Sequence, residues 1–283
     1  MEITKVDLYE YFGKKRDGSK RGYLYVYQPT FHIEHPATRI RPAMIVVPGG
    51  GYAFWSFREG EPIVLNYMAN GFIGALLDYS LAPESYPTQL FEGLMAVMYL
   101  RENAEKLHID KEHICAIGFS AGGHLCGTMA TLFNDDIVKK EFGERADNAR
   151  LDAVILSYPV ITSNNKSHYG SIENVTHGNH DLYDKVSIEK QVTSASSPAF
   201  IWSTQADDVV PVENSLLVAE AYVKAKVPMQ LHIFERGRHG LSLANNEVSF
   251  KTDNDSTDDN VAQWFGLSMK WLTMRGFVIK NNQ

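Results

Sequence analysis

Two kinds of hydrophobic pattern alternate along the chain and predict alternating strands and helices. Continuous apolar runs, typical of strands buried on both faces, lie at residues 42–47, 72–79, 113–119, 151–158, 199–204 and 229–235. Stretches with the composition or apolar spacing of helices lie at residues 61–70, 89–107, 125–132, 213–226 and 259–275. Strands that alternate with helices imply right-handed crossovers and a mostly parallel central sheet with helices on both faces, which is an α/β fold.

Two further segments depart from this alternation. Two early segments, residues 6–12 and 22–28, have an alternating pattern with aromatic and β-branched side chains. The turn-rich residues 13–18 lie between them, which predicts an antiparallel opening pair of strands. Residues 159–198 form one long irregular insertion. Insertions of that size in a compact domain usually have a functional role or contain short helices. We therefore expect a single domain over residues 1–283, in which residues 159–198 cover a pocket.

Composition narrows the classes of protein. The 283 residues, 44% apolar and 22% charged, suffice for one large core. The net charge of −7 is spread without a basic stripe, so we expect neither nucleic acid nor a membrane as a partner. No leader pattern or membrane-spanning run occurs, which predicts a cytoplasmic protein. Cys115 and Cys126 are expected to be buried thiols without a disulfide.

The strongest candidate for chemistry is the pentapeptide from Gly118 to Gly122, which fits the pattern G-x-S-x-G. An apolar strand precedes it and a helical stretch follows it, which is the context that a nucleophile elbow requires. Ser120 would stand at the apex of the sharp turn. The backbone N–H of Ala121, at the start of the helix, would point at an oxygen that develops negative charge.

A serine nucleophile needs a histidine base and a carboxylate to orient it, in the chain order serine, acid, histidine. Asp207 and Asp208 both follow the strand at 199–204, and either could serve. We favour Asp207 because it is nearer to the strand end. His239, between Gly237 and Gly240, follows the last strand and is the expected base, whereas His124 is expected to pack in the helix or to make a supporting hydrogen bond.

Backbone amides can approach a reacting oxygen closely only where side chains are absent, and residues 49–51 are three consecutive glycines after a strand. A phosphate-binding loop is the alternative interpretation of these glycines, but the sequence that follows has neither the glycine spacing of a dinucleotide-binding motif nor that of a P-loop.

The acidic residues 253–259 lack the glycine and the final glutamate of a calcium loop, so we expect a solvated loop that caps the last helix. We expect no metal or cofactor.

Together these stretches resemble the α/β-hydrolase superfamily, in particular small bacterial carboxylesterases of the acetyl-xylan-esterase-like and hormone-sensitive-lipase-like group. The matching stretches are residues 48–52, 78–84, 118–125, 207–211 and 239–241. The resemblance implies Ser120 as nucleophile, Asp207 as acid and His239 as base. It also implies an oxyanion hole formed by the amides of Gly50, Gly51 and Ala121.

Pro48 stands where many relatives have histidine before the glycines, which resembles the acetyl-xylan-esterase-like subgroup. The expected function is a cofactor-free serine carboxylesterase that hydrolyses short-acyl esters, including those of acetylated sugars, through an acyl-enzyme. The polar insertion favours short acyl groups over lipid. An amidase, formamidase or peptidase would use the same triad, and a non-catalytic binding protein could share the scaffold. The sequence leaves open a homo-oligomer, and whether Phe54, Trp55 and Phe57 close over the site.

Overall fold

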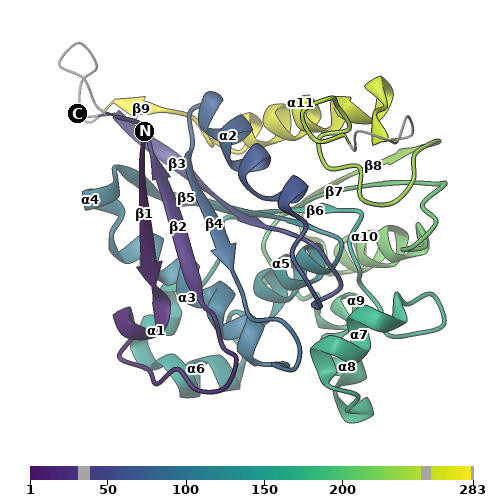
Figure 1. Ribbon diagram of the computed structural model, residues 1–283, viewed down its shortest axis with the longest axis horizontal. Helices are drawn as coiled ribbons and strands as arrows, with labels where there is room; N and C mark the ends of the chain where they lie inside the picture. The colour runs from purple at the N-terminus through teal and green to yellow at the C-terminus, as the bar shows by residue number, and fades with distance from the viewer. Residues whose placement is uncertain (31–38, 250–255, 282–283) are drawn as a thin grey trace.

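A computed structural model describes residues 1–30, 39–249 and 256–281, and their strands form one nine-stranded sheet (Figure 1). The strand order is β1-β2-β4-β3-β5-β6-β7-β8, with β9 paired to β3. All neighbours from β4 to β8 run parallel, whereas β2 is antiparallel to both β1 and β4. The strands are β1 (Glu2–Asp7), β2 (Tyr23–Gln28), β3 (Arg39–Val47), β4 (Ile73–Asp78), β5 (Ile109–Phe119), β6 (Ala153–Ser157), β7 (Ala199–Thr204), β8 (Met229–Phe234) and β9 (Lys280–Asn281).

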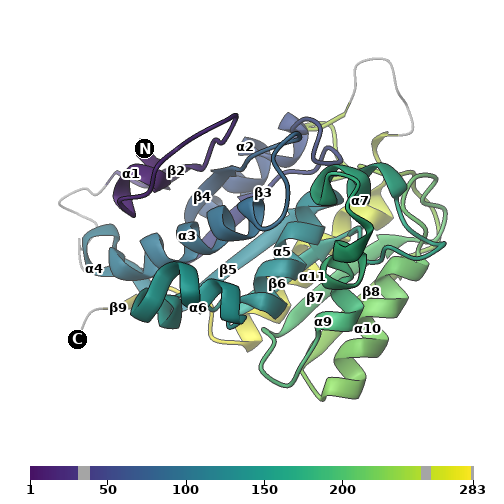
Figure 2. The same ribbon diagram turned by 90° about the horizontal axis from the view of Figure 1, so that it is seen from below.

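Helices cover both faces of the sheet (Figures 1 and 2). Alternate side chains of β3 enter opposite cores: Ile45 packs on the side of α3, α5, α6 and α10, and Met44 packs on the side of α2 and α11. The α-helices are α1 (Leu8–Tyr11), α2 (Glu61–Ala69), α3 (Thr88–Glu102), α4 (Ala104–Leu107), α5 (Ala121–Leu132), α6 (Asp136–Phe142), α7 (Tyr169–Thr176), α8 (Tyr183–Val186), α9 (Ile188–Gln191), α10 (Glu213–Ala225) and α11 (Asp259–Met274). Short 3₁₀ turns lie at Phe57–Glu59, Gly143–Asn148 and His180–Leu182. The predicted α/β class and the mostly parallel sheet are confirmed.

The antiparallel opening pair is also confirmed, but its first strand was predicted at the wrong residues. The strand is Glu2–Asp7 rather than 6–12, because the Asp7 carboxylate accepts a hydrogen bond from the Glu10 backbone N–H and caps α1. The single helix predicted over 89–107 is likewise wrong. It is divided at Asn103, whose side chain donates to the Tyr99 carbonyl and competes with the helical hydrogen bonds there.

The insertion at residues 159–198 contains three short α-helices, α7 to α9, and the 3₁₀ turn His180–Leu182. Its apolar side chains, among them Ile172, Val186 and Ile188, are buried in the core that contains α5. Of the two alternatives that the sequence allowed for an insertion of this size, short helices are therefore present. Residues 31–38, in the connection between β2 and β3, lie outside the described part of the chain.

Smaller expectations are met where the structure describes the residues. Cys115 and Cys126 are free and buried. Asp258 caps α11 by accepting from the backbone N–H groups of Asn260 and Val261, while residues 253–255 of the acidic tract lie outside the described residues. Within residues 1–30, 39–249 and 256–281, no helix has the length and apolar character needed to span a membrane.

Candidate active site

Ser120 occupies the sharp turn between β5 and α5. Its backbone has φ 52° and ψ −117°, a conformation that L-residues rarely adopt. Hydrogen bonds hold it there: the Ser120 N–H donates to the Ser157 carbonyl at 3.0 Å, and the Ser120 carbonyl accepts from the N–H groups of Val160 and His124. The strained serine is therefore fixed from both neighbouring segments, as expected of a nucleophile elbow.

The glycines of the pentapeptide are required by close packing. A Cβ atom on Gly118 would lie 2.1 Å from the Gly122 carbonyl oxygen, and one on Gly122 would lie 2.2 Å from the Val47 carbonyl oxygen. Both contacts are with backbone atoms, which cannot move aside without displacing β3 or α5. Each glycine thus allows the helix to start directly against the sheet.

Three side chains from separate segments form one hydrogen-bonded chain. The Ser120 Oγ lies 2.8 Å from His239 Nε2, and His239 Nδ1 lies 2.8 Å from Asp207 Oδ2. The other carboxylate oxygen of Asp207 accepts from the backbone N–H groups of Val209 and Val210, at 2.9 and 2.8 Å. With Asp207 oriented by its own loop, His239 presents Nε2 to the serine, which is the geometry of a general base.

The two adjacent carboxylates contact different parts of the His239 residue. Asp207 reaches the imidazole ring, whereas Asp208 Oδ1 accepts a hydrogen bond of 3.0 Å from the His239 backbone N–H. That backbone hydrogen bond lowers the pKa of Asp208. In the structure, the favoured Asp207 therefore contacts the imidazole ring, whereas Asp208 binds the backbone of the loop that carries His239.

The three consecutive glycines differ in their contacts. The Gly49 N–H donates to the Glu59 carboxylate at 2.8 Å and is thereby occupied. Gly50 and Gly51 have φ values of 127° and 64°, and both line the pocket that contains Ser120. The Ala121 N–H begins α5, where helical N–H groups have no intrahelical acceptor. The oxyanion hole that the resemblance implied, formed by the amides of Gly50, Gly51 and Ala121, stays a prediction.

Sequence reasoning missed a buried carboxylate that joins both sides of the site. Glu59 is 3% exposed; besides binding the Gly49 N–H, it accepts a 2.7 Å hydrogen bond from the Tyr158 hydroxyl. The Tyr158 oxygen in turn accepts from the Ser242 N–H at 2.9 Å, beyond the His239 loop. Burial raises the pKa of Glu59 and raises that of Tyr158 well above its ordinary value. No sequence pattern marks Glu59, since its partners Gly49 and Tyr158 lie 10 and 99 residues away and share no motif with it.

The Ser120 pocket has a volume of about 470 Å³, and the insertion supplies one of its walls. His168 and Asn174 line it, and the Asn174 side chain donates to the Gly51 carbonyl at 2.8 Å. Burial lowers the pKa of His168. Phe54 lines the same pocket and is 61% exposed, whereas Trp55 lines a different cavity. The aromatic residues after the glycines therefore do not act as one cover.

His124 has the supporting role that the sequence suggested. Its ring lies in the core, with Nδ1 2.7 Å from the Tyr52 hydroxyl and Nε2 2.7 Å from the Val186 carbonyl oxygen. Burial lowers the pKa of His124 to about 4. Because a carbonyl can only accept, the neutral ring carries its proton on Nε2 and accepts at Nδ1. His124 thus connects the glycine segment, α5 and the insertion.

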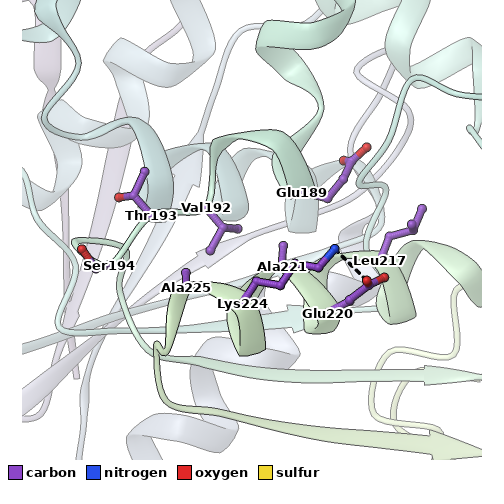
Figure 3. Close-up of a pocket in the computed structure, with 9 residues that line it drawn as sticks. All are labelled: Glu189, Val192, Thr193, Ser194, Leu217, Glu220, Ala221, Lys224 and Ala225. Atoms are coloured by element: carbon purple, nitrogen blue, oxygen red, sulfur yellow. Dashed lines mark ion pairs between the residues drawn. The ribbon is translucent and has the colours of Figure 1, made fainter.

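A separate hollow lies between α10 and the segment around α9 (Figure 3). Its side chains include the ion pair between Lys224 and Glu220, 2.7 Å apart, on one face of α10. It shares no lining residue with the Ser120 pocket.

In the part of the chain that the structure describes, no group of three or more histidine, cysteine, aspartate or glutamate residues is placed to hold a metal ion.

Known proteins are similar to this chain in sequence, and solved structures are similar to it in fold. An endo-1,4-β-xylanase B of Butyrivibrio fibrisolvens is 40% identical over 214 residues, which are 73% of this chain but only 33% of that protein. An acetylxylan esterase of Xylanibacter ruminicola is 28% identical over 75% of this chain and 43% of its own length. The chain thus spans less than half of these curated relatives.

Two solved structures are similar over nearly their whole length. An acetyl ester-xyloside bifunctional hydrolase from Caldicellulosiruptor lactoaceticus has a TM-score of 0.79 and 34% identity, over 90% of this chain and 89% of that one. A carboxylesterase from Lactobacillus plantarum has a TM-score of 0.85 and 28% identity, over 99% and 100%. The BD-FAE family matches residues 31–222. Because that match covers most of the chain, the protein belongs to the BD-FAE family and has the α/β-hydrolase fold.

Proposed function

We propose that the protein is a serine carboxylesterase that hydrolyses short-acyl esters, including acetyl groups carried on sugars. The observation that carries the proposal is the pair of 2.8 Å hydrogen bonds from Ser120 through His239 to Asp207, at the wall of an open pocket. A serine hydroxyl is a weak nucleophile until a positioned base takes its proton. This arrangement supplies that base.

In the proposed mechanism, Ser120 Oγ attacks the ester carbonyl carbon while His239 Nε2 takes the hydroxyl proton. The amides of Gly50, Gly51 and Ala121 stabilise the negative oxygen of the tetrahedral intermediate. His239 then gives the proton to the leaving alcohol, and the acyl group remains on Ser120. A water molecule, deprotonated by His239, attacks the acyl carbon. The bond from that carbon to Ser120 Oγ then breaks, His239 returns the proton to Oγ, and the acid leaves.

Polar groups around the pocket favour small acyl groups. Arg58, His168, Asn174 and Arg238 line it together with the catalytic residues. A long acyl chain gains about 0.8 kcal/mol for each CH₂ only when that CH₂ is buried against apolar surface. The acetylxylan esterase name of one relative and the acetyl ester-xyloside name of one structural neighbour support acetylated sugars as substrates.

Two measurements test the proposal. A fluorophosphonate probe should label the wild-type protein and fail to label Ser120→Ala. Among p-nitrophenyl esters, acetate to butyrate should give the highest kcat/KM, with a steep fall beyond about six carbons, because a longer chain must cover the polar and charged side chains that line the pocket. A kcat/KM that rises from butyrate to decanoate would contradict the small-acyl preference, and faster cleavage of p-nitroacetanilide than of p-nitrophenyl acetate would favour an amidase.

A further inference from the structure

A second cavity, of about 630 Å³, lies beside the Ser120 pocket. Ser56 lines both cavities, and its N–H donates to the Gly49 carbonyl at 3.0 Å within the loop that carries the proposed oxyanion donors. The second cavity extends from this loop across β2 and β4 to the start of α2. We call it the β2 groove; its lining residues are Arg21, Tyr25, Tyr27, Pro48, Trp55, Ser56, Phe57, Gly60, Glu61, Pro62, Leu76, Leu77 and Asp78.

Aromatic side chains dominate the β2 groove. Tyr25 and Tyr27 lie two residues apart on β2 and therefore project from the same face of the sheet. Trp55 and Phe57 come from the loop after the glycines, and Phe57 is 84% exposed. Tyr27 is buried, at 5% exposure, so the rings accessible to a ligand are those of Tyr25, Trp55 and Phe57. Such ring faces in a groove are suited to the C–H faces of a ring-shaped ligand.

Charged groups with fixed geometry lie among these rings. The Arg21 guanidinium binds the Asp78 carboxylate through two hydrogen bonds, of 2.6 and 3.1 Å, and stands 3.9 Å above the Trp55 ring. Across the groove, the Glu61 carboxylate lies 3.4 Å from the Tyr27 hydroxyl. Bidentate pairing holds Arg21 in one orientation. Because Asp78 is only 8% exposed, the charged groups open to a ligand are the remaining Arg21 N–H donors and the exposed Glu61 carboxylate.

This combination selects the class of ligand. A lipid chain would have to cover the charged side chains of Arg21 and Glu61, which is unfavourable unless they find new partners. A polyanion would be repelled, because the charged groups of the groove are two carboxylates and only one guanidinium. A neutral saccharide has apolar ring faces for the aromatic side chains and hydroxyl groups that both donate to carboxylates and accept from arginine.

We propose that the β2 groove binds the saccharide chain of an esterified sugar, while the acyl group of the same substrate enters the Ser120 pocket. The inference rests on the proposed esterase function and specifies its alcohol side. Ser56, the residue shared by the two cavities, marks where the chain passes from one to the other. The groove then selects oligosaccharide esters over simple alkyl esters.

Binding can be measured without turnover, because xylotetraose that carries no acetyl group contains no ester. Of the four tryptophans, Trp202, Trp264 and Trp271 are buried, so a change in fluorescence on titration reports mainly on Trp55. Tyr25→Ala should weaken binding about tenfold, through the loss of one stacked ring and its buried area. Tyr23→Ala is the matched control: Tyr23 lies on the same strand and the same face, pairs with Arg16, and does not line the groove.

Kinetics separate this inference from the proposed function. For Tyr25→Ala, the ratio of kcat/KM for acetylated xylotetraose to kcat/KM for p-nitrophenyl acetate should fall about tenfold, while Tyr23→Ala keeps the wild-type ratio. If wild type hydrolyses p-nitrophenyl acetate but Tyr25→Ala keeps the wild-type ratio and affinity, the saccharide groove is wrong and the esterase stands. If wild type neither hydrolyses the ester nor reacts with a fluorophosphonate, the proposed function is itself wrong. Concentration-dependent dimerisation that Tyr25→Ala abolishes would assign the groove to a second copy of the chain instead.

Discussion

The two sides of the candidate active site are held by different kinds of interaction. On the nucleophile side, Ser120 is fixed by backbone packing, since both Gly118 and Gly122 lie where a Cβ would meet backbone oxygen within 2.2 Å. On the base side, His239 is held by hydrogen bonds that it donates, from its ring Nδ1 to Asp207 and from its backbone N–H to Asp208. The contact between Gly118 and Gly122 joins near neighbours and appears in the sequence as a motif. Side-chain hydrogen bonds between distant segments do not.

The largest predicted effect lies at the nucleophile. Ser120→Ala removes the attacking oxygen and leaves the backbone of the elbow unchanged, so kcat for p-nitrophenyl acetate should fall on the order of a millionfold. The thermal unfolding midpoint should stay within a few degrees of wild type. His239→Ala should be about equally inactive, because members of a triad act as a unit. Retention of more than a few per cent of activity by Ser120→Ala would make another residue the nucleophile.

The next effect separates the two carboxylates on the base side. Asp207→Asn leaves the imidazole without the acceptor that fixes its tautomer, so kcat should fall roughly 10⁴-fold. Asp208→Asn keeps an oxygen that can accept from the His239 backbone N–H, so its kcat should fall no more than a few-fold. Parallel kinetics of the two variants measure the difference. The reverse order would assign the acid to Asp208.

A third prediction tests the backbone packing of the glycine segment. A Cβ on Gly50 would lie 2.0 Å from the Phe54 carbonyl oxygen, whereas the nearest atom to a Cβ on Gly51 is 3.8 Å away. Gly50→Ala should displace the loop and lower kcat by about 10²- to 10³-fold, the loss expected for one oxyanion donor. Gly51→Ala serves as the control. There is room for its Cβ and it retains its N–H, so its kcat should fall less than that of Gly50→Ala, although the protein should lose about 1–2 kcal/mol of stability because the φ of this residue is 64°. Equal kcat in the two variants would show that space around Gly50 does not position the donors.

The smallest effect concerns Glu59, which connects the two sides. Glu59→Gln keeps one acceptor for the Gly49 N–H but cannot also accept from the Tyr158 hydroxyl, so kcat should fall roughly fivefold with little change in KM. Tyr158→Phe is the matched variant, since it removes the same hydrogen bond from the other partner. If both variants retain wild-type kcat, the Glu59 network does not position the glycine amides.

Glu59 also predicts a dependence of stability on pH. Burial raises its pKa in the folded protein above the ordinary value of 4.5, so the folded state favours the protonated carboxyl. Its contribution to stability is complete below pH 4.5 and is lost as the pH rises through the raised pKa. The free energy of unfolding of wild type minus that of Glu59→Gln, from urea titrations, should therefore decrease from pH 4.5 to pH 8. A difference that increases with pH would mean that the pKa of Glu59 is lowered instead.

Most of the sheet followed from the hydrophobic pattern because parallel strands buried on both faces are continuous apolar runs, and β7 was predicted at its observed bounds. The strand β5 begins at Ile109, four residues before its predicted start at 113. Two other errors lie where a polar side chain changes the backbone. Asp7 begins a helix inside the expected first strand, and Asn103 divides the expected long helix. Both residues form local hydrogen bonds that compete with regular structure, and their sequence context does not say which alternative wins.

The sequence by itself determined the fold class, the elbow around Ser120 and the chain order of serine, aspartate and histidine. These features depend on local sterics and on the succession of strands, both of which the order of residues records. Only the tertiary structure decided that Asp207 rather than Asp208 reaches the ring, that Gly49 is already bound by Glu59, and that Ser56 joins two cavities. The physical reason is that hydrogen-bond direction and cavity shape depend on how segments are oriented in space, and the partners lie from 10 residues apart, as in Gly49 and Glu59, to 119 apart, as in Ser120 and His239. No periodicity in the chain encodes that orientation.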